Sequence, residues 1–156
     1  MPSASIRIEP VEGGAGDVCR SILDELPSWF GIAEANDDYV AHADRCDGVI
    51  ALVDDRPIGI TTVLHHSEHS AEIYLMAVRP THHRAGVGSA MLDHVERRLV
   101  ADGVEYLQVK TLSPAHRDPG YAATRRFYVA TGFRWLEEFP TLWGEQNPAL
   151  MLVKRL

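Results

Sequence analysis

The sequence has little cysteine and no long apolar run. Its two cysteines, Cys19 and Cys46, make neither a disulfide framework nor a metal-binding pattern, so we expect reduced thiols in a reducing cytoplasm. No stretch approaches the ~20 apolar residues that span a bilayer, and the first residues lack a charged leader followed by an apolar run. We therefore expect a soluble cytoplasmic protein with no membrane partner.

The sequence also lacks an excess of basic residues. Its 15 Lys and Arg face 22 Asp and Glu, which gives a formal net charge of −7 and a pI of about 5.5. Because binding to nucleic acid requires a broad basic face, we expect no nucleic-acid partner. An acidic protein instead favours a cationic, amine-bearing substrate, although net charge does not locate a site.

What is present is the composition of one folded domain. The 156 residues are 46% hydrophobic and 24% charged, so we expect a single domain over residues 1–156 with a sizeable core. The apolar periodicity predicts the order β-α-α-β-β-β-α-β-α-β-β, a mixed α/β layer fold. Strands are predicted at 5–9, 49–53, 58–65, 72–78, 104–110, 133–137 and 149–153, and helices at 17–26, 37–44, 86–100 and 121–131.

A partial dinucleotide-binding fingerprint lies near the start of the chain. Gly14 and Gly16 supply two of its three glycines, and Cys19 stands at the third position. That fingerprint requires a second parallel strand soon after the helix. Because turns and a short polar helix follow instead, we do not favour a Rossmann fold.

The most informative stretch is residues 73–99, where an apolar strand leads into a proline, a basic turn with two glycines, and a helix. An apolar residue recurs at every fourth position of this helix, which predicts a face packed on the sheet. Those residues are Val87, Met91, Val95 and Leu99. The helix must then begin at the strand's end, where its free N–H groups attract phosphate.

The turn itself combines small and basic residues. Gly86 and Gly88 have no side chain to keep a ligand from the backbone, and His82, His83 and Arg84 add positive or potentially positive groups. The turn is not a Walker loop, since the Gly-Lys-Ser/Thr end is missing. A tight strand-to-helix turn with a solvated arginine explains the same residues, so both interpretations stay open on this turn alone.

Two blocks together resemble the GNAT superfamily of N-acetyltransferases. Val78-Arg79-Pro80 followed by His83-Arg84-Ala85-Gly86-Val87-Gly88 is similar to its acetyl-CoA motif, Gln/Arg-x-x-Gly-x-Gly/Ala. Arg126-Phe127-Tyr128 through Gly132-Phe133 is similar to its second signature, an aromatic pair followed by Gly-Phe. The resemblance spans roughly residues 49–156. His83 departs from the usual Gln or Arg, so we expect Arg84 to share the phosphate role.

The resemblance implies a GNAT-like acyl-CoA N-acyltransferase fold, an α/β fold whose central, mixed but mostly antiparallel sheet has about seven strands flanked by about four helices. It implies acetyl-CoA as co-substrate, no metal, and a small-molecule or peptide amine as acceptor. It also implies strands that splay apart, here 72–78 and 104–110, and a homodimer is common in the family. The implied cofactor-binding residues are Met76, Ala77 and Val78 for the pantetheine arm, and His83, Arg84, Ala85, Gly86, Val87, Gly88 and Ser89 for the pyrophosphate.

The resemblance further implies direct transfer of the acetyl group to the amine. Tyr128 is then the expected general acid for the departing thiolate, although it also fits a core aromatic residue. Glu72 is the leading general base, because the alternation of its strand places it on one face with Tyr74 and Met76. A solvated Glu72 is the alternative, with the neighbouring histidines 65 and 66 as rival bases.

Other side chains fit a function less directly. His65, His66 and His69 suggest a metal site, but the first two should point to opposite faces of a strand, so we expect no metal. An acidic rim for a cationic amine and an aromatic wall are candidate features of an acceptor site, with solvated surface and ordinary packing as the alternatives. The rim would contain Asp37, Asp38, Glu137, Glu138 and Glu145, and the wall Trp29, Phe30 and Trp143.

Two functions follow. The first is an N-acetyltransferase that moves an acetyl group from acetyl-CoA to an amine. The second is a non-catalytic acyl-CoA-binding or sensing domain that has kept the phosphate turn. The aromatic pair that includes Tyr128 favours the enzyme.

Overall fold

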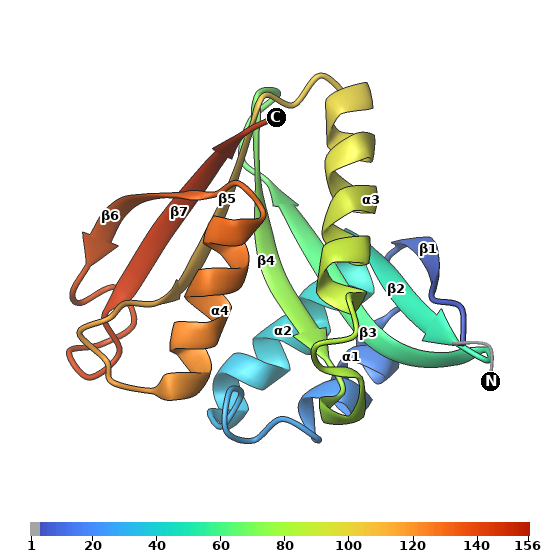
Figure 1. The fold of residues 1–156 in the computed structure, drawn as a ribbon, viewed down its shortest axis with the longest axis horizontal. Coiled ribbons are helices and arrows are strands. Elements are labelled where there is room, and N and C mark those ends of the chain that lie inside the picture. The colour runs from blue at the N-terminus through green and yellow to red at the C-terminus, as the bar shows by residue number, and fades with distance from the viewer. Residues whose placement is uncertain (1–3) are drawn as a thin grey trace.

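A seven-stranded sheet in the order β1-β2-β3-β4-β5-β7-β6 organises residues 4–156, the part of the chain that the computed structural model describes (Figure 1). The strands are β1 (Arg7–Glu12), β2 (Asp47–Val53), β3 (Arg56–His65), β4 (Ser70–Val78), β5 (Tyr106–Leu112), β6 (Arg134–Phe139) and β7 (Ala149–Arg155). The helices are α1 (Gly16–Leu23), α2 (Ala33–Arg45), α3 (Val87–Ala101) and α4 (Pro119–Ala130), with a short 3-10 turn, η1 (Pro80–His82). The predicted fold class and order of elements are confirmed.

The sheet is antiparallel except where β4 pairs with β5. The expected end of the first strand at Pro10 is wrong, because β1 continues to Glu12 with Pro10 opposite Val49. An edge strand tolerates proline, since the missing N–H can face away from its neighbour.

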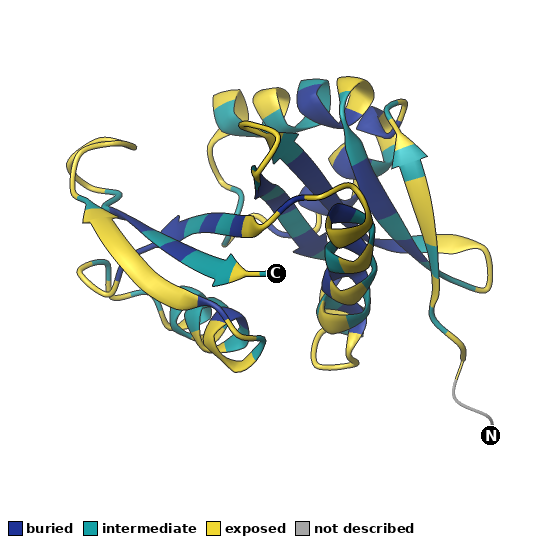
Figure 2. Ribbon diagram, turned by 90° about the horizontal axis from the view of Figure 1, so that it is seen from above, coloured by how far each residue is buried: buried dark blue, intermediate teal, exposed yellow. Residues whose placement is uncertain are grey.

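Two cores cover the two faces of the sheet. On one face α3 and α4 pack with buried residues of the strands, and the predicted apolar stripe of α3 is buried throughout. On the other face α1 and α2 cover β3 and β4. Figure 2 shows the buried residues gathered on the strands and inner helix faces, whereas β6 is exposed along nearly its whole length.

β4 and β5 diverge soon after they meet (Figure 1). Residues 70–73 pair with residues 106–109, but the strands continue to Val78 and Leu112 without further pairing to each other. We call residues 74–78 of β4 and 110–112 of β5 the splay. Within the described chain, the splay leaves one edge of β4 without a strand partner. This edge lies beside the turn that leads from β4 into α3.

A β-bulge in β4 lies where the splay begins. Thr62 pairs with Leu75 but Val63 pairs with Ile73, so Tyr74 is the extra residue. The bulge changes which side chains share a face. Met76 packs with the α3 core, whereas Tyr74 contacts α2. The expectation that Glu72 and Met76 lie on one face is therefore wrong, because strict alternation fails at the bulge.

Candidate active site

The turn between β4 and α3 presents backbone donors. Arg84 and Gly86 have left-handed φ angles of +60° and +80°. Within the described chain, no N–H of residues 84–89 donates to a backbone acceptor, and the first helical bond runs from Ala90 N–H to Gly86 O at 3.0 Å. Alternating backbone conformations at a positive helix end form a concave row of donors that suits phosphate.

The two glycines of this turn have different roles. A Cβ on Gly86 would meet nothing within 4 Å, so its positive φ is the reason for glycine there. A Cβ on Gly88 would lie 3.2 Å from Phe127 Cζ and 3.6 Å from Met76 Sδ. Gly88 therefore allows α3 to approach α4 and β4 closely.

His83 is engaged by protein groups. Its Nε2 lies 2.7 Å from Val78 O, and its ring meets the Trp29 ring edge to face at a centroid distance of 5.6 Å. The neighbouring Arg84 is exposed and forms no ion pair with any described residue. This arrangement favours Arg84 over His83 as the side chain available to a phosphate.

The expected cofactor residues of β4 line the splay. Met76 and Val78 are half-buried on the α3 side, and Ala77 is buried on the α1 side. The strand they form has β3 on one edge and no described strand on the other. A free strand edge can bind an extended ligand through its main chain. Val87 begins α3 and is buried, while Ala85 and Ser89 are exposed.

Tyr128 lies in α4 with only 5% of its surface exposed. Its ring meets Phe127 and Phe133 edge to face, at centroid distances of 5.2 Å and 5.3 Å. Burial raises the pKa of the phenol well above its usual range, which keeps it protonated. Among the described residues, no hydrogen bond involves its hydroxyl. Tyr128 is thus a core aromatic whose proton is not committed to another protein group.

Glu72 is 6% exposed, so it is not a solvated surface residue. Its Oε1 lies 2.7 Å from His66 Nε2 and 2.9 Å from Lys110 Nζ. The carboxylate is therefore paired with a cation, and its second oxygen, Oε2, has no hydrogen bond from a described group. Sequence reasoning missed Lys110, because its proximity to Glu72 depends on the register between β4 and β5.

Half-buried aromatic rings and the buried His42 surround the bulge on the α2 side. The Tyr74 ring lies 5.4 Å from that of Tyr39 and 4.2 Å from that of His42, and Tyr39 meets Phe30 at 5.8 Å. Burial raises the pKa of both tyrosines and lowers that of His42. Of this group, sequence reasoning found only Phe30, because the others occupy ordinary strand and helix positions.

The expected acidic rim and aromatic wall are not single clusters. Asp37 pairs with Arg20 at 2.7 Å, and Glu138 accepts a hydrogen bond from Ser113 Oγ at 3.0 Å. Trp143 is exposed, and no ring contact joins it to the other aromatics of the described chain. Glu137 and Glu138 line a hollow of about 380 Å³ beside β6, which contains none of the expected cofactor residues.

Arg79 anchors the end of β4, a role that the sequence alone did not indicate. The guanidinium is 7% exposed and donates to Pro57 O at 2.8 Å, to Ser21 Oγ at 2.9 Å and to Glu25 Oε2 at 2.6 Å. It joins α1 to the strand immediately before the turn of residues 83–89, so it fixes where that turn begins.

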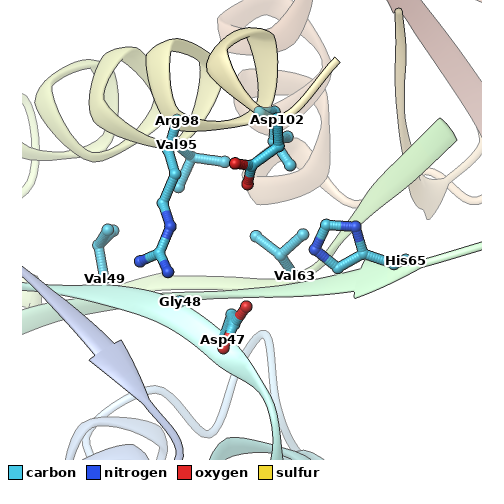
Figure 3. A pocket seen from close by; sticks show the side chains of 9 residues that line it. Asp47, Gly48, Val49, Val63, His65, Val95, Arg98 and Asp102 are labelled. Carbon is cyan, nitrogen blue, oxygen red and sulfur yellow. The ribbon is translucent and has the colours of Figure 1, made fainter. Parts of the chain in front are cut away.

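A small cavity lies at the far end of α3 (Figure 3). Its volume is about 20 Å³, enough for roughly one water molecule, so it is not a substrate site. His65 lines it, whereas His66 contacts Glu72, so these histidines do point to opposite faces. Within residues 4–156 no group of three or more potential ligands is placed to hold a metal ion. None of the helices in that range is long and apolar enough to cross a membrane.

Comparison with known proteins identifies the family of the chain. The family model described as Acetyltransferase (GNAT) family matches residues 17–133. The chain belongs to the GNAT family of acetyltransferases. Among curated proteins, no sequence matches the chain.

Solved structures agree on the fold. A protein assigned to the GNAT family from Desulfovibrio desulfuricans is 19% identical with a TM-score of 0.83, covering 97% of this chain and 99% of that one. A GNAT acetyltransferase from Elizabethkingia anophelis with acetyl-CoA bound is 18% identical, with a TM-score of 0.73 and coverage of 97% and 98%. The ribosomal-protein-S18-alanine N-acetyltransferase from Escherichia coli is 17% identical, with a TM-score of 0.76 and coverage of 97% and 94%. At these identities the likeness is one of fold.

Proposed function

We propose that the protein is an N-acetyltransferase that transfers the acetyl group of acetyl-CoA directly to an amine. The observation that carries this proposal is that a row of free backbone amides and an unpaired strand edge lie next to each other. The free amides of residues 84–89 adjoin the unpartnered edge of β4 at Val78. One extended ligand with a pyrophosphate at one end fits both features.

Acetyl-CoA supplies an activated acetyl group and a thiolate leaving group. The amides of residues 84–89 and the Arg84 side chain would bind its pyrophosphate, with Gly86 and Gly88 keeping the backbone accessible. The edge formed by Met76, Ala77 and Val78 would bind its pantetheine arm as an added strand. His83 would contribute through its backbone, because its ring is held by Val78 O.

Tyr128 would act as the general acid. The reaction forms a C–N bond and breaks the C–S bond, so the departing sulfur gains one proton and the amine loses one. Burial keeps the Tyr128 phenol protonated, and its hydroxyl is free to donate. Glu72 would take the amine proton through Oε2, directly or through water, while Lys110 and His66 hold Oε1.

The acceptor is an amine on a small molecule or a peptide. The half-buried aromatics around the bulge, including Tyr39 and Tyr74, would face it on the α2 side. Acetyl-CoA would approach from the opposite side of the sheet, where α3 and α4 lie.

The test is release of CoA thiol, followed across a panel of small amines and peptides, with acetyl-CoA alone as the control. We expect amine-dependent release and an acetylated product of the expected mass. Tight CoA binding without release from any amine class would instead identify a non-catalytic acyl-CoA-binding protein.

We further propose that residues 1–156 act as one domain and form a homodimer through β6. This strand is a sheet edge, and Trp135 and Leu136 on it are 55% and 59% exposed. An edge strand can pair with the same edge of a second copy about a two-fold axis. Light scattering should give a dimer mass, and Leu136→Lys should give a monomer.

A further inference from the structure

The segment between α1 and α2 crosses the open end of the splay (Figure 1). Trp29 in this segment contacts both sides. Its ring meets the His83 ring at a centroid distance of 5.6 Å and an interplanar angle of 85°. His83 begins the phosphate turn, residues 83–89, which would bind the pyrophosphate. The backbone oxygen of Trp29 accepts a hydrogen bond from Tyr121 Oη, in α4, at 2.6 Å. One residue thus connects the β4 side of the splay to the β5 side.

The start of α4 is shaped to receive Trp29. A Cβ on Gly120 would lie 3.0 Å from Trp29 Nε1, so the absence of a side chain there lets the indole lie against the helix. Asp118 caps this helix by accepting a hydrogen bond from Gly120 N–H at 2.7 Å. The position of Tyr121 is therefore fixed by the cap as well as by its bond to Trp29.

We propose that Trp29 and Tyr121 are positioning residues that form a strap across the splay, hold the pantetheine arm of bound acetyl-CoA against β4, and exclude water from its thioester. The inference rests on the proposed function, because it concerns the same ligand. It adds Trp29 and Tyr121 to the proposed acetyl-CoA site, and both lie outside the phosphate turn and the edge of β4.

The physical reason lies in the lack of strand pairing between the two sides, since β4 and β5 do not pair beyond Ile73 and Val109. On the α3 side, Phe127 packs near Gly88 and Met76 across this gap. At the open end, the strap adds one ring contact and one hydrogen bond. Burial raises the pKa of Tyr121 to about 12, so the phenol remains a donor at neutral pH.

A purely structural contact would behave differently. Loss of such a contact would lower the free energy of unfolding but would leave CoA affinity and water exclusion unchanged in the folded protein. If the contact is a strap, its loss should instead weaken CoA binding and speed the hydrolysis of acetyl-CoA when no amine is present.

The experiment compares Tyr121→Phe and Trp29→Leu with the unaltered protein, using calorimetry with CoA. Loss of one hydrogen bond should weaken CoA binding about fivefold in Tyr121→Phe, and loss of the indole should weaken it tenfold or more in Trp29→Leu. Amine-independent hydrolysis of acetyl-CoA should rise in both. Tyr106→Phe is the matched control, because Tyr106 is exposed at the start of β5.

A spectroscopic measurement keeps the test independent of turnover. The chain has three tryptophans, so in a Trp135→Phe/Trp143→Phe protein all tryptophan emission comes from Trp29. CoA should shift that emission, and Trp29→Phe, which keeps an aromatic ring, should restore part of the affinity that Trp29→Leu loses. Variants that fold and bind CoA like the unaltered protein, with no shift in emission, would overturn the strap alone. Failure of the unaltered protein to bind CoA would overturn the proposed function and the strap together.

Discussion

Lys110 Nζ lies 2.9 Å from Glu72 Oε1, and this ion pair bridges β4 and β5 where the two strands part. The side chains are 21% and 7% exposed, so the pair is largely removed from water. His66 adds a second donor to the same oxygen, but it is more exposed. Lys110 is therefore the main compensation for a buried carboxylate in the middle of the candidate site.

Lys110→Met should destabilise the protein by about 3 kcal/mol, because a buried charge that loses its partner costs about that much. Urea unfolding at pH 7.5 measures the change. The double variant Glu72→Gln/Lys110→Met should recover much of the loss, since it leaves no unpaired charge. A Lys110→Met protein as stable as the unaltered one would show that His66 or water compensates Glu72 instead.

Glu72→Gln should lower turnover about 10²-fold if the carboxylate accepts the amine proton. CoA affinity should stay unchanged, since Glu72 lies before the splay and away from the phosphate turn. Steady-state kinetics and calorimetry separate the two quantities. His66→Gln is the control, and a larger loss of turnover in that variant than in Glu72→Gln would transfer the role of base to His66.

Tyr128→Phe should lower turnover by about 10²-fold with little effect on folding, because phenylalanine keeps the ring contacts with Phe127 and Phe133. The raised pKa of Tyr128 also predicts how turnover depends on pH. A phenol that titrates above its usual value of about 10 stays protonated up to that pH, so turnover should not fall between pH 8 and about 10 through loss of this proton. Undiminished turnover in a folded Tyr128→Phe protein would remove Tyr128 from the mechanism.

Local patterns made much of this site predictable from sequence. The strand-turn-helix order around Gly86 and the apolar stripe of α3 are set by neighbours within a few residues, and the structure has both. The bulge at Tyr74 is not predictable in this way, since strict alternation is the default for a strand and a bulge depends on its partner. The contacts of Glu72 with Lys110 and of Trp29 with Tyr121 join residues 38 and 92 positions apart, which only the folded chain brings together.

Gly86→Ala and Gly88→Ala should separate conformational strain from packing at the phosphate turn. The methyl group of an alanine at position 86 would meet no atom within 4 Å, but the residue must adopt a left-handed φ, which costs about 1 kcal/mol. Alanine at position 88 places a methyl group 3.2 Å from Phe127 Cζ, so α3 or α4 must shift. Both variants should bind CoA more weakly by calorimetry, but only Gly88→Ala should perturb the aromatic near-UV circular dichroism. The same spectrum for both variants would contradict the packing role of Gly88.

His42 should make stability depend on pH. It is 6% exposed in α2, its Nε2 lies 3.3 Å from Val63 O, and burial lowers its pKa. In the unfolded chain a histidine binds its proton near pH 6.5, whereas folded His42 binds one only at a lower pH. The unfolded state therefore holds more protons between these two values, so stability rises with pH in that window. The contribution of His42 is complete above about pH 6.5 and is lost as the pH falls below it.

His42→Gln keeps a donor for Val63 O but does not titrate, so it isolates this effect. Urea unfolding at intervals from pH 5 to pH 8 should show the unaltered protein losing stability below about pH 6.5 more steeply than the variant. The difference in slope is bounded by one proton, about 1.4 kcal/mol per pH unit. The remaining histidines are common to both proteins, so their contributions cancel in the comparison. Parallel curves would mean that His42 takes up its proton in the folded state as readily as in the unfolded chain, with Asp38 and Glu72 as the nearby carboxylates able to stabilise its charge.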